Sequence, residues 1–402
     1  MRFAVLSNII PPTPYGQSIV LYRLLNNVPP DQYYLITDES QISSTVASAE
    51  LPATTYRIGL PPRRQWASPL DMVKRAYRRL HGRSGEMENF IHLRARQISE
   101  VIQRDPCCAL VVATGDLVSM PAAAIACAEN GVPFIPYIFD DYAYHMVDWT
   151  REMAIRLMQP MMTQAAEVIV TNEATDTEYR RRYHISNTTV IHNAAPILDL
   201  DSIRNPNPVL DKSTFNIVYS GAVYHAHYDA FRNMIQAIET LPKNTVKLHL
   251  FTDQSAESIA SKGISGDCLV HHGHVNQSMI AATLLEADLL FLPLAFDAPT
   301  QEVLRLASPG KMGDYLGMAK PILVHAPADC YIAQYFRQHD CGVVVDKPDV
   351  ALLAQTISDI VAGKIDTERL AHNARQQAEI DFATEHVQAQ FMALMQKVCQ
   401  PA

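Results

Sequence analysis

The sequence predicts an α/β protein of two domains, each built on a parallel β-sheet with helices on both faces. Three observations support this prediction. The chain has 402 residues, more than a single hydrophobic core usually holds. Short apolar runs alternate with helical stretches, as buried parallel strands and their connecting helices do. This alternation stops at a Pro-rich segment, residues 196–213, and then begins again.

The first half opens with a strand, a loop and a helix. Residues 3–7 are rich in β-formers, residues 11–16 are mainly proline and glycine, and residues 19–25 carry apolar side chains at helical spacing. Helices are also expected at 120–130 and 150–165. Further strands are predicted at 33–36, 109–113, 134–139, 168–171 and 189–191. This strand-first order is typical of a doubly wound sheet.

The second half repeats the pattern, with a strand at 215–219, a turn at Ser220 and Gly221, and a helix at 230–240. More strands are predicted at 246–251, 268–271, 289–292, 322–324 and 342–345. We therefore expect an N-terminal domain over residues 1–200, a C-terminal domain over 201–383, and a final helix over 384–402 that crosses back to the first domain. Ligands of such sheets bind at the carboxyl ends of the strands, here facing the cleft between the domains.

The composition excludes several classes of protein. A hydrophobic content of 48% and a charged content of 19% are typical of a globular chain. A net charge of -9 argues against nucleic acid as the partner. The seven cysteines show no Cys-x-x-Cys spacing, so we expect neither a disulfide framework nor a zinc site, and a reducing compartment. No signal peptide or membrane span is evident, so we expect a cytoplasmic protein.

One segment is basic although the chain as a whole is acidic. Residues 63–104 contain ten Arg or Lys against four acids, a charge of +6 that leaves -15 for the remainder. Within this segment, residues 72–80 are cationic and amphipathic. Such a helix suits the anionic inner face of a membrane, which would make the protein peripheral there. A solvated helix on the surface of the first domain is the alternative, and the sequence leaves both open.

Several short stretches follow one another along the chain in a characteristic order and at characteristic spacing. In the second half they are Phe215-Asn-Ile-Val-Tyr-Ser-Gly-Ala, Gly273-His-Val, Ala287-Asp-Leu-Leu-Phe-Leu-Pro, Ser308-Pro-Gly-Lys-Met-Gly-Asp-Tyr-Leu and Cys341-Gly-Val-Val-Val-Asp. The first half adds Val168-Ile-Val-Thr-Asn-Glu-Ala and Val190-Ile-His-Asn-Ala. Together these stretches resemble glycosyltransferase family 4. The resemblance implies the GT-B fold, in which two Rossmann-like domains face a central cleft.

The resemblance also implies an activity, the transfer of a hexosyl group from a nucleotide-diphosphate donor, UDP- or GDP-linked, to an acceptor hydroxyl. It implies retention of the anomeric configuration, no metal, no cofactor, and a glycan or lipid-linked acceptor in polysaccharide or glycolipid synthesis. The second domain would bind the nucleotide sugar and the first the acceptor. Two alternatives remain open: a sugar-nucleotide epimerase on the same fold, and a non-catalytic partner subunit that binds a sugar nucleotide.

The donor site needs positive charge and N–H donors, because the diphosphate leaves with growing negative charge. Lys311 stands after a Pro-Gly turn and before a helical pattern, where backbone N–H groups and one lysine form an anion site. A plain junction with a solvated lysine is the alternative. Asp314 stands where the family has a Glu that binds the ribose. The residues expected to bind the donor are Gly16, Gly221, His225, Val275, Ser308, Gly310, Lys311 and Asp314.

Three residues are candidates for catalysis. Asp141 and His145 follow the apolar run 134–139 and should emerge at a strand's carboxyl end, where they would position the acceptor hydroxyl. Helix capping is the alternative for Asp141. Glu302 is the acid nearest to Leu306, the position where the family has its first Glu, and a solvent-facing loop residue is the alternative. Asp199-Leu-Asp201 falls in the linker, and we interpret it as a chance match to a metal motif.

Overall fold

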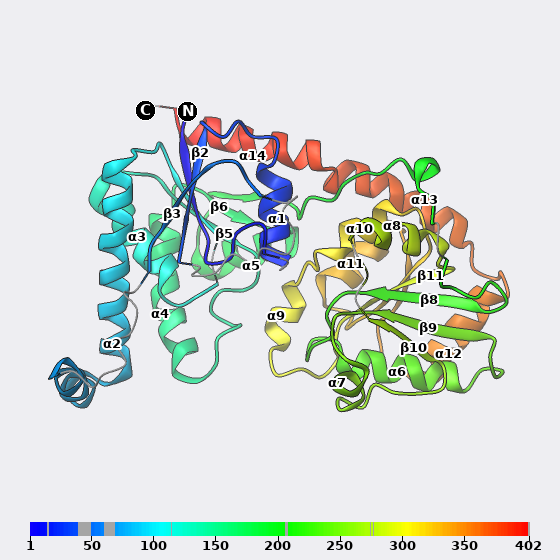
Figure 1. Ribbon diagram of the computed structural model, residues 1–402. Coiled ribbons are helices and arrows are strands. Elements are labelled where there is room, and N and C mark those ends of the chain that lie inside the picture. Colours follow the sequence, from blue (N-terminus) through cyan, green and yellow to red (C-terminus); the bar gives the residue numbers. More distant parts are fainter. Residues whose placement is uncertain are drawn as a thin grey trace. The chain divides into compact units, whose positions relative to one another are not determined.

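The computed structural model describes residues 1–13, 16–38, 50–59, 69–113, 115–205, 208–273, 275 and 277–400, the side chains of 69–84 and 277–278 excepted. The chain forms two compact units (Figure 1). The first runs from Met1 to Ala194 and resumes at Val387, and the second runs from Ala195 to His386. Every strand pairing in both sheets is parallel. The predicted architecture of two Rossmann-like α/β domains is confirmed.

The first unit contains a seven-stranded sheet in the order β3-β2-β1-β4-β5-β6-β7. Chain order reverses between the neighbours β1 and β4, which makes this the switch point of the sheet. The strand bounds are β1 Phe3–Leu6, β2 Tyr33–Thr37, β3 Thr54–Arg57, β4 Leu110–Val112, β5 Phe134–Ile138, β6 Val168–Val170 and β7 Thr188–Val190.

Helices cover both faces of this sheet, because successive strand residues point to opposite sides. Ala4 and Leu6 of β1 pack into a core with α2, α3, α4 and α5, whereas Phe3 and Val5 pack into a second core with α1 and α14. The helix bounds are α1 Gly16–Leu25, α2 Pro69–Arg104, α3 Ser119–Asn130, α4 Asp148–Gln164, α5 Glu173–Tyr183 and α14 Thr384–Val398.

The C-terminal helix α14 completes the core of the first unit, and Figure 1 shows it (red) beside the blue N-terminal strands. Its Phe391 ring lies edge-on to Phe3 with 5.7 Å between centroids. Cys399, one residue beyond α14, forms a disulfide with Cys108, and their Cα atoms are 5.1 Å apart. The expectation of no disulfide is therefore wrong. The two cysteines are 291 positions apart, and only the return of α14 brings them together, so sequence spacing could not reveal the pair.

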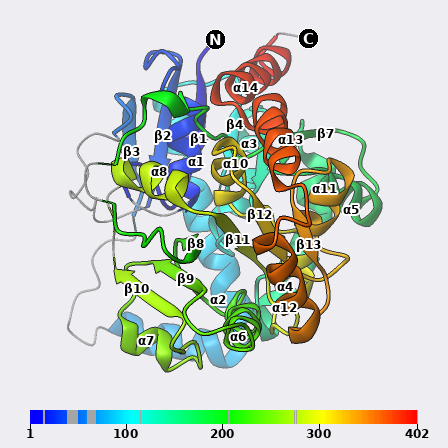
Figure 2. The ribbon, with the colours of Figure 1, turned by 90° about the vertical axis from the view of Figure 1, so that its right-hand side faces the viewer.

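The second unit contains a six-stranded sheet in the order β10-β9-β8-β11-β12-β13, with its switch point between β8 and β11. Helices α6 and α12 pack together against one face (Figure 2). The strand bounds are β8 Phe215–Ser220, β9 Val246–Phe251, β10 Leu269–Gly273, β11 Leu289–Pro293, β12 Ile322–His325 and β13 Val343–Val345. The helix bounds are α6 Tyr228–Glu239, α7 Ala256–Ala260, α8 Gln277–Glu286, α9 Gln301–Leu306, α10 Lys311–Gly317, α11 Tyr331–Gln338, α12 Val350–Val361 and α13 Thr367–Gln377.

The segments on which the chain enters and leaves the second unit lie side by side. Ala195 forms a parallel bridge with Ala383, in which the Ala195 N–H donates to the Phe382 carbonyl at 2.7 Å. Helix α10 rests directly on this pair of segments through Gly313, where an added Cβ would lie only 2.9 Å from the Cβ of Ala195. A glycine at this position therefore fixes how closely α10 approaches the entry and exit segments.

The basic residues 72–80 belong to α2, but their side chains lie outside the described residues, so the amphipathic face expected there stays a prediction. Within the described part of the chain, no helix combines the length and the apolar character needed to cross a membrane.

Candidate functional site

The first candidate site lies at the switch point of the second sheet, the usual ligand position in open α/β sheets. Gly221 follows β8 directly and adopts φ +127°, a conformation that side chains rarely tolerate. The Nζ atom of Lys311, from α10, lies 3.0 Å from the position that a Cβ on Gly221 would occupy. Two of the residues predicted to bind a donor, 90 positions apart, therefore meet at the end of one strand.

Lys311 is held by an aromatic residue of β8 that the sequence analysis did not single out. Its Nζ hydrogen-bonds to the hydroxyl of Tyr219 and lies 4.0 Å from the centroid of the same ring. Burial lowers the pKa of Lys311 to about 7, against a smaller opposing attraction from Asp314. At neutral pH the group therefore lies close to its own titration midpoint.

Helix α10 is fixed against the end of β8 by a second tyrosine. The Ser220 N–H donates a 2.9 Å hydrogen bond to the hydroxyl of Tyr315, which is buried. Because α10 has only seven residues, its macrodipole is small, and Lys311 is the stronger source of positive potential here. Gly310, at the start of α10, is exposed, whereas Ser308 and Asp314 are half-buried.

Residues of the loop after β8 contact the start of α9. His225 is exposed, and its Nε2 lies 3.3 Å from the Thr300 hydroxyl. Glu302, two positions along the chain from Thr300, is exposed on α9. Leu306, at the position of the missing family acid, is buried with 4% exposure. The loop after β8 therefore contacts the residue that precedes α9, and α9 buries Leu306 at the position where the family resemblance implies a carboxylate.

The ends of β9 and β10 border the same edge of the sheet. The Thr252 N–H donates to the Gly273 carbonyl at 3.1 Å, and Val275 follows two positions later, half-buried. Gln254 then braces the loop after β8, since its amide both accepts from the Val223 N–H at 2.6 Å and donates to the Val223 carbonyl at 2.9 Å. These contacts of Gln254 could not be predicted from the sequence, because Gln254 stands in an ordinary polar turn.

The second candidate site lies at the switch point of the first sheet. Gly16 is exposed at the start of α1, and the neighbouring Gln17 donates from its amide to the Ser7 hydroxyl at 2.8 Å and to the Ala113 carbonyl. The loops after β1 and β4 are thereby joined. The ring of His145 lies 3.6 Å from the Cβ position of Gly115. The structure thus brings Gly16 and His145 to the same edge of the first sheet.

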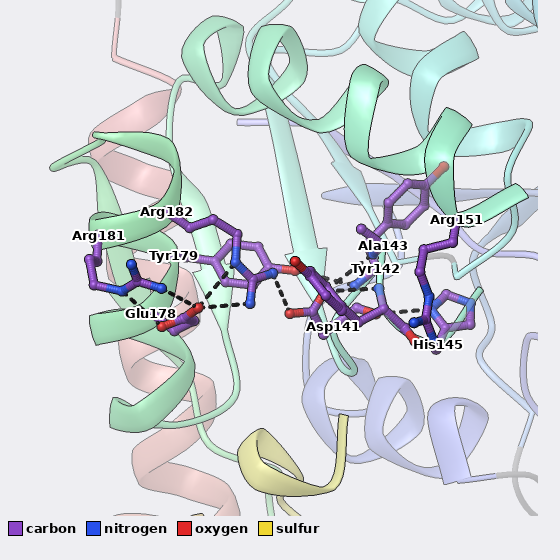
Figure 3. A network of polar contacts seen from close by, with 10 residues as sticks. Asp141, Tyr142, Ala143, His145, Arg151, Glu178, Tyr179, Arg181 and Arg182 are labelled. Carbon is purple, nitrogen blue, oxygen red and sulfur yellow. Dashed lines mark hydrogen bonds and ion pairs between the residues drawn. The ribbon is translucent and has the colours of Figure 1, made fainter. Parts of the chain in front are cut away.

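Asp141 is engaged in a network that leaves its carboxylate no free oxygen (Figure 3). One oxygen forms a 2.6 Å ion pair with Arg182, and the other accepts from the backbone N–H groups of Ala143 and Tyr144 at 3.2 Å. The Asp141 side chain is fully buried, and the Arg182 guanidinium also lies 4.5 Å from the Tyr144 ring centroid. These contacts fix the loop that carries His145.

Glu178 is the second acid that holds Arg182, through a 2.9 Å ion pair. Burial opposes ionisation of Glu178, but hydrogen bonds from Arg181 and Arg182 outweigh it and lower its pKa. Burial of Arg182 opposes its charge, but attraction to Asp141 and hydrogen bonds with Tyr183 and Asp141 together outweigh it and raise its pKa. The expectation that Asp141 acts in catalysis does not fit this geometry, because the carboxylate already binds a cation and caps a turn. His145, half-buried with its Nδ1 3.0 Å from the Asp141 carbonyl, remains the candidate in this loop.

The Asp199-Leu-Asp201 motif forms a local cap, in which the Asp199 carboxylate accepts from the Asp201 N–H at 3.3 Å. Among the residues that the structure describes, no three His, Cys, Asp or Glu side chains gather in a way that would hold a metal ion.

No protein-family model and no curated protein sequence matches the chain. Solved structures match it over nearly its whole length. A glycosyltransferase from Rickettsia africae has a TM-score of 0.69 at 10% identity, covering 100% of both chains. Anabaena Alr3699/HepE in complex with UDP has a TM-score of 0.67 at 14% identity, covering 99% of this chain and 100% of that one. An α,α-trehalose-phosphate synthase (UDP-forming) from Burkholderia xenovorans has a TM-score of 0.69 at 11% identity, with coverage of 99% and 100%. These similarities show that the chain has the GT-B fold.

Proposed function

We propose that the protein is a glycosyltransferase that moves a sugar from a UDP- or GDP-linked donor to an acceptor hydroxyl. The meeting of Lys311 with Gly221 at the end of β8 is the observation that carries this proposal. It puts a lysine and a turn without a side chain at the ligand position of the second unit. HepE with bound UDP and UDP-glucose, and a synthase described as UDP-forming, share the fold, which favours UDP as the first nucleotide to test.

Each unit has a role in this proposal. Lys311 meets the negative charge that grows on the diphosphate as its bond to the sugar breaks. Asp314, three positions further along α10, accepts hydrogen bonds from ribose hydroxyls. The first unit binds the acceptor, a glycan or a lipid-linked sugar of polysaccharide or glycolipid synthesis, with His145 near the reacting hydroxyl. The family resemblance supports retention of configuration, and the basic segment 63–104 supports a location on the inner face of a membrane.

A panel of UDP and GDP sugars tests the activity. Turnover of one donor with release of the nucleoside diphosphate is the expected result. Lys311→Ala should lower kcat/KM by about 10²–10³-fold, the scale of a lost group that stabilises developing charge. The control is Lys347→Ala, since Lys347 is an exposed lysine of the same unit. Equal turnover by both variants would contradict the proposal, and epimerised donor without nucleotide release would identify an isomerase instead.

We also propose that transfer is independent of metal, because Lys311 supplies positive charge to the diphosphate. Turnover should survive an excess of chelator. Complete loss of turnover in chelator, restored by magnesium or manganese, would overturn this part of the proposal.

A second candidate function, a subunit that binds a sugar nucleotide without turning it over, is favoured by Leu306. This buried leucine occupies the position where the family has an acid. Calorimetric binding of a nucleotide sugar, with no nucleotide released in the presence of any acceptor, would identify this function.

A further inference from the structure

Lys311 has an unusual partner for a lysine placed to bind an anion. Within the described part of the chain, its hydrogen-bond partner is the phenol of Tyr219 rather than a carboxylate. The phenol has one hydrogen, and that hydrogen is donated to the Ala222 carbonyl at 2.7 Å. The oxygen of Tyr219 is therefore left as an acceptor, and Lys311 donates to it whether it is an amine or an ammonium.

The position of Lys311 is fixed from three sides. The Tyr219 ring lies beneath Nζ at 4.0 Å, and the turn at Gly221 passes beside it. Tyr219 is itself fully buried, with its ring packed edge-on against Phe231 at 4.9 Å between centroids. Because the tyrosine cannot move without disturbing the core, it holds the lysine at the end of β8 before any ligand arrives.

The titratable groups around Lys311 come from β8, the loop after it, and α10 itself. Burial keeps Tyr219 and Tyr315 neutral by raising their pKa. Burial, and then the charge of Lys311, lower the pKa of His227 well below its usual value, so this histidine is also neutral. Tyr224 and His225 occupy the same loop, and their rings meet edge-on at 5.4 Å between centroids. Asp314 is the acid whose charge attracts Lys311.

We propose that Tyr219 is a positioning residue that holds Lys311 at the end of β8 without a paired carboxylate among the described residues, and that binding of a nucleoside diphosphate draws one proton from solvent onto Lys311. The diphosphate supplies the anion that the described surroundings of Lys311 provide only weakly, so the ammonium becomes the favoured form. The proton returns to solvent when the nucleotide leaves. This inference rests on the proposed function, since it assigns a regulatory property to the same site.

The pKa of Lys311 in the unliganded protein sets how nucleotide affinity depends on pH. Below about pH 7 Lys311 already carries its proton, and nucleotide binding needs no further proton. Above that pH the proton must be taken up, so affinity falls as pH rises, by at most about tenfold per pH unit. A terminal phosphate loses its last proton with a pKa of about 6, so between about pH 7.5 and 9 its charge is nearly constant.

Calorimetric titration with UDP and with GDP, in buffers of different ionisation enthalpy, counts the protons directly. Near pH 8.5 the wild-type protein should take up about one proton per nucleotide. Lys311→Arg should take up none, because a guanidinium stays charged at that pH. Tyr219→Phe keeps the ring but loses the acceptor, so its affinity should fall about fivefold near pH 8.5 and less near pH 7.

Three outcomes would count against the inference. Equal proton uptake by the wild type and Lys311→Arg would show that Lys311 is not the group that titrates. An equal loss of affinity in Tyr219→Phe at every pH would show that Tyr219 has only a structural role. If Tyr219→Phe does not fold, the comparison of the wild type with Lys311→Arg still tests whether Lys311 takes up the proton. Failure of UDP and GDP to bind at any pH would contradict the proposed function itself, which separates the two claims.

Discussion

At the end of β8 the backbone turns through Gly221, and the space that a side chain would occupy there is next to the amine of Lys311. Gly221→Ala would put a methyl group 3.0 Å from Nζ and force a side chain into φ +127°. The Lys311 side chain must then move away from the turn. We expect UDP affinity, measured by calorimetry, to fall by roughly tenfold, since the displaced lysine loses a hydrogen bond to a charged group, worth about 1.5–3 kcal/mol.

The matched control is Gly363→Ala. Gly363 lies in the same unit with a positive φ of +67° and no described atom within 4 Å of its Cβ position, so Ala there meets an unfavourable backbone conformation but not the lysine. Its affinity for UDP should match that of the wild type. An equal loss in both variants would mean that general strain, not displacement of Lys311, causes the effect.

Substitutions of Asp141 and His145 should have opposite effects on stability and turnover, although the two residues share one loop. Asp141→Asn removes the charge that holds Arg182, whose side chain is only 16% exposed. We expect a loss of about 2–4 kcal/mol in the free energy of unfolding, the scale of a broken buried ion pair. His145→Ala should lose less than about 1 kcal/mol but most of its turnover. Denaturant unfolding and initial rates separate the two, and an inactive Asp141→Asn with wild-type stability would return Asp141 to a catalytic role.

At the scale of residues, the sequence reveals side chains that stand out locally. Lys311 stands after a Pro-Gly turn and Gly221 ends a strand, so each could be selected from its neighbours along the chain. Tyr219 could not, because within an apolar strand it resembles a core residue. The ion pair of Asp141 could not be predicted either, since its partner Arg182 is 41 positions away on another element.

At the scale of elements, the disulfide between Cys108 and Cys399 attaches the end of α14 to the start of β4. Cys399→Ser should lower the free energy of unfolding by about 2–4 kcal/mol under oxidising conditions and have little effect in reductant. Thiol titration of the unfolded protein should find five free cysteines before reduction and seven after it. Seven thiols without reduction would show that the two cysteines lie together unbonded.

The elements predicted best are the buried ones. Expected strands at 134–139 and 246–251 match β5 Phe134–Ile138 and β9 Val246–Phe251, because strands covered on both faces are apolar throughout. Strand β3, Thr54–Arg57, was missed because it lies at the edge of the sheet and none of its residues is buried. Helix α2 extends over 36 residues, far beyond what its charged sequence suggested.

At the scale of the whole molecule, charge is distributed unevenly along the chain. Residues 63–104 carry +6 against -15 elsewhere, so we expect the protein to bind anionic vesicles at low salt. Each basic residue near such a surface contributes about 1 kcal/mol. Binding should weaken with added salt, since surface charges are screened beyond roughly 10 Å at 0.1 M. Co-sedimentation of the wild type and of a variant with Lys74, Arg75, Arg78 and Arg79 changed to Gln tests this, and unchanged binding by the variant would contradict it.

The return of α14 to the first unit sets an order of events on the ribosome. Translation of the first unit begins before that of the second, yet Val387, Phe391, Leu394 and Met395 of its core emerge only after the whole of the second unit. Nearly two hundred residues separate its two parts, from Ala194 to Val387, which at about 5–20 residues per second means roughly 10–40 s of synthesis. During that interval one face of the nascent sheet is covered by α1 but not by α14. The second unit, contiguous in sequence, is therefore complete before α14 can finish the first unit.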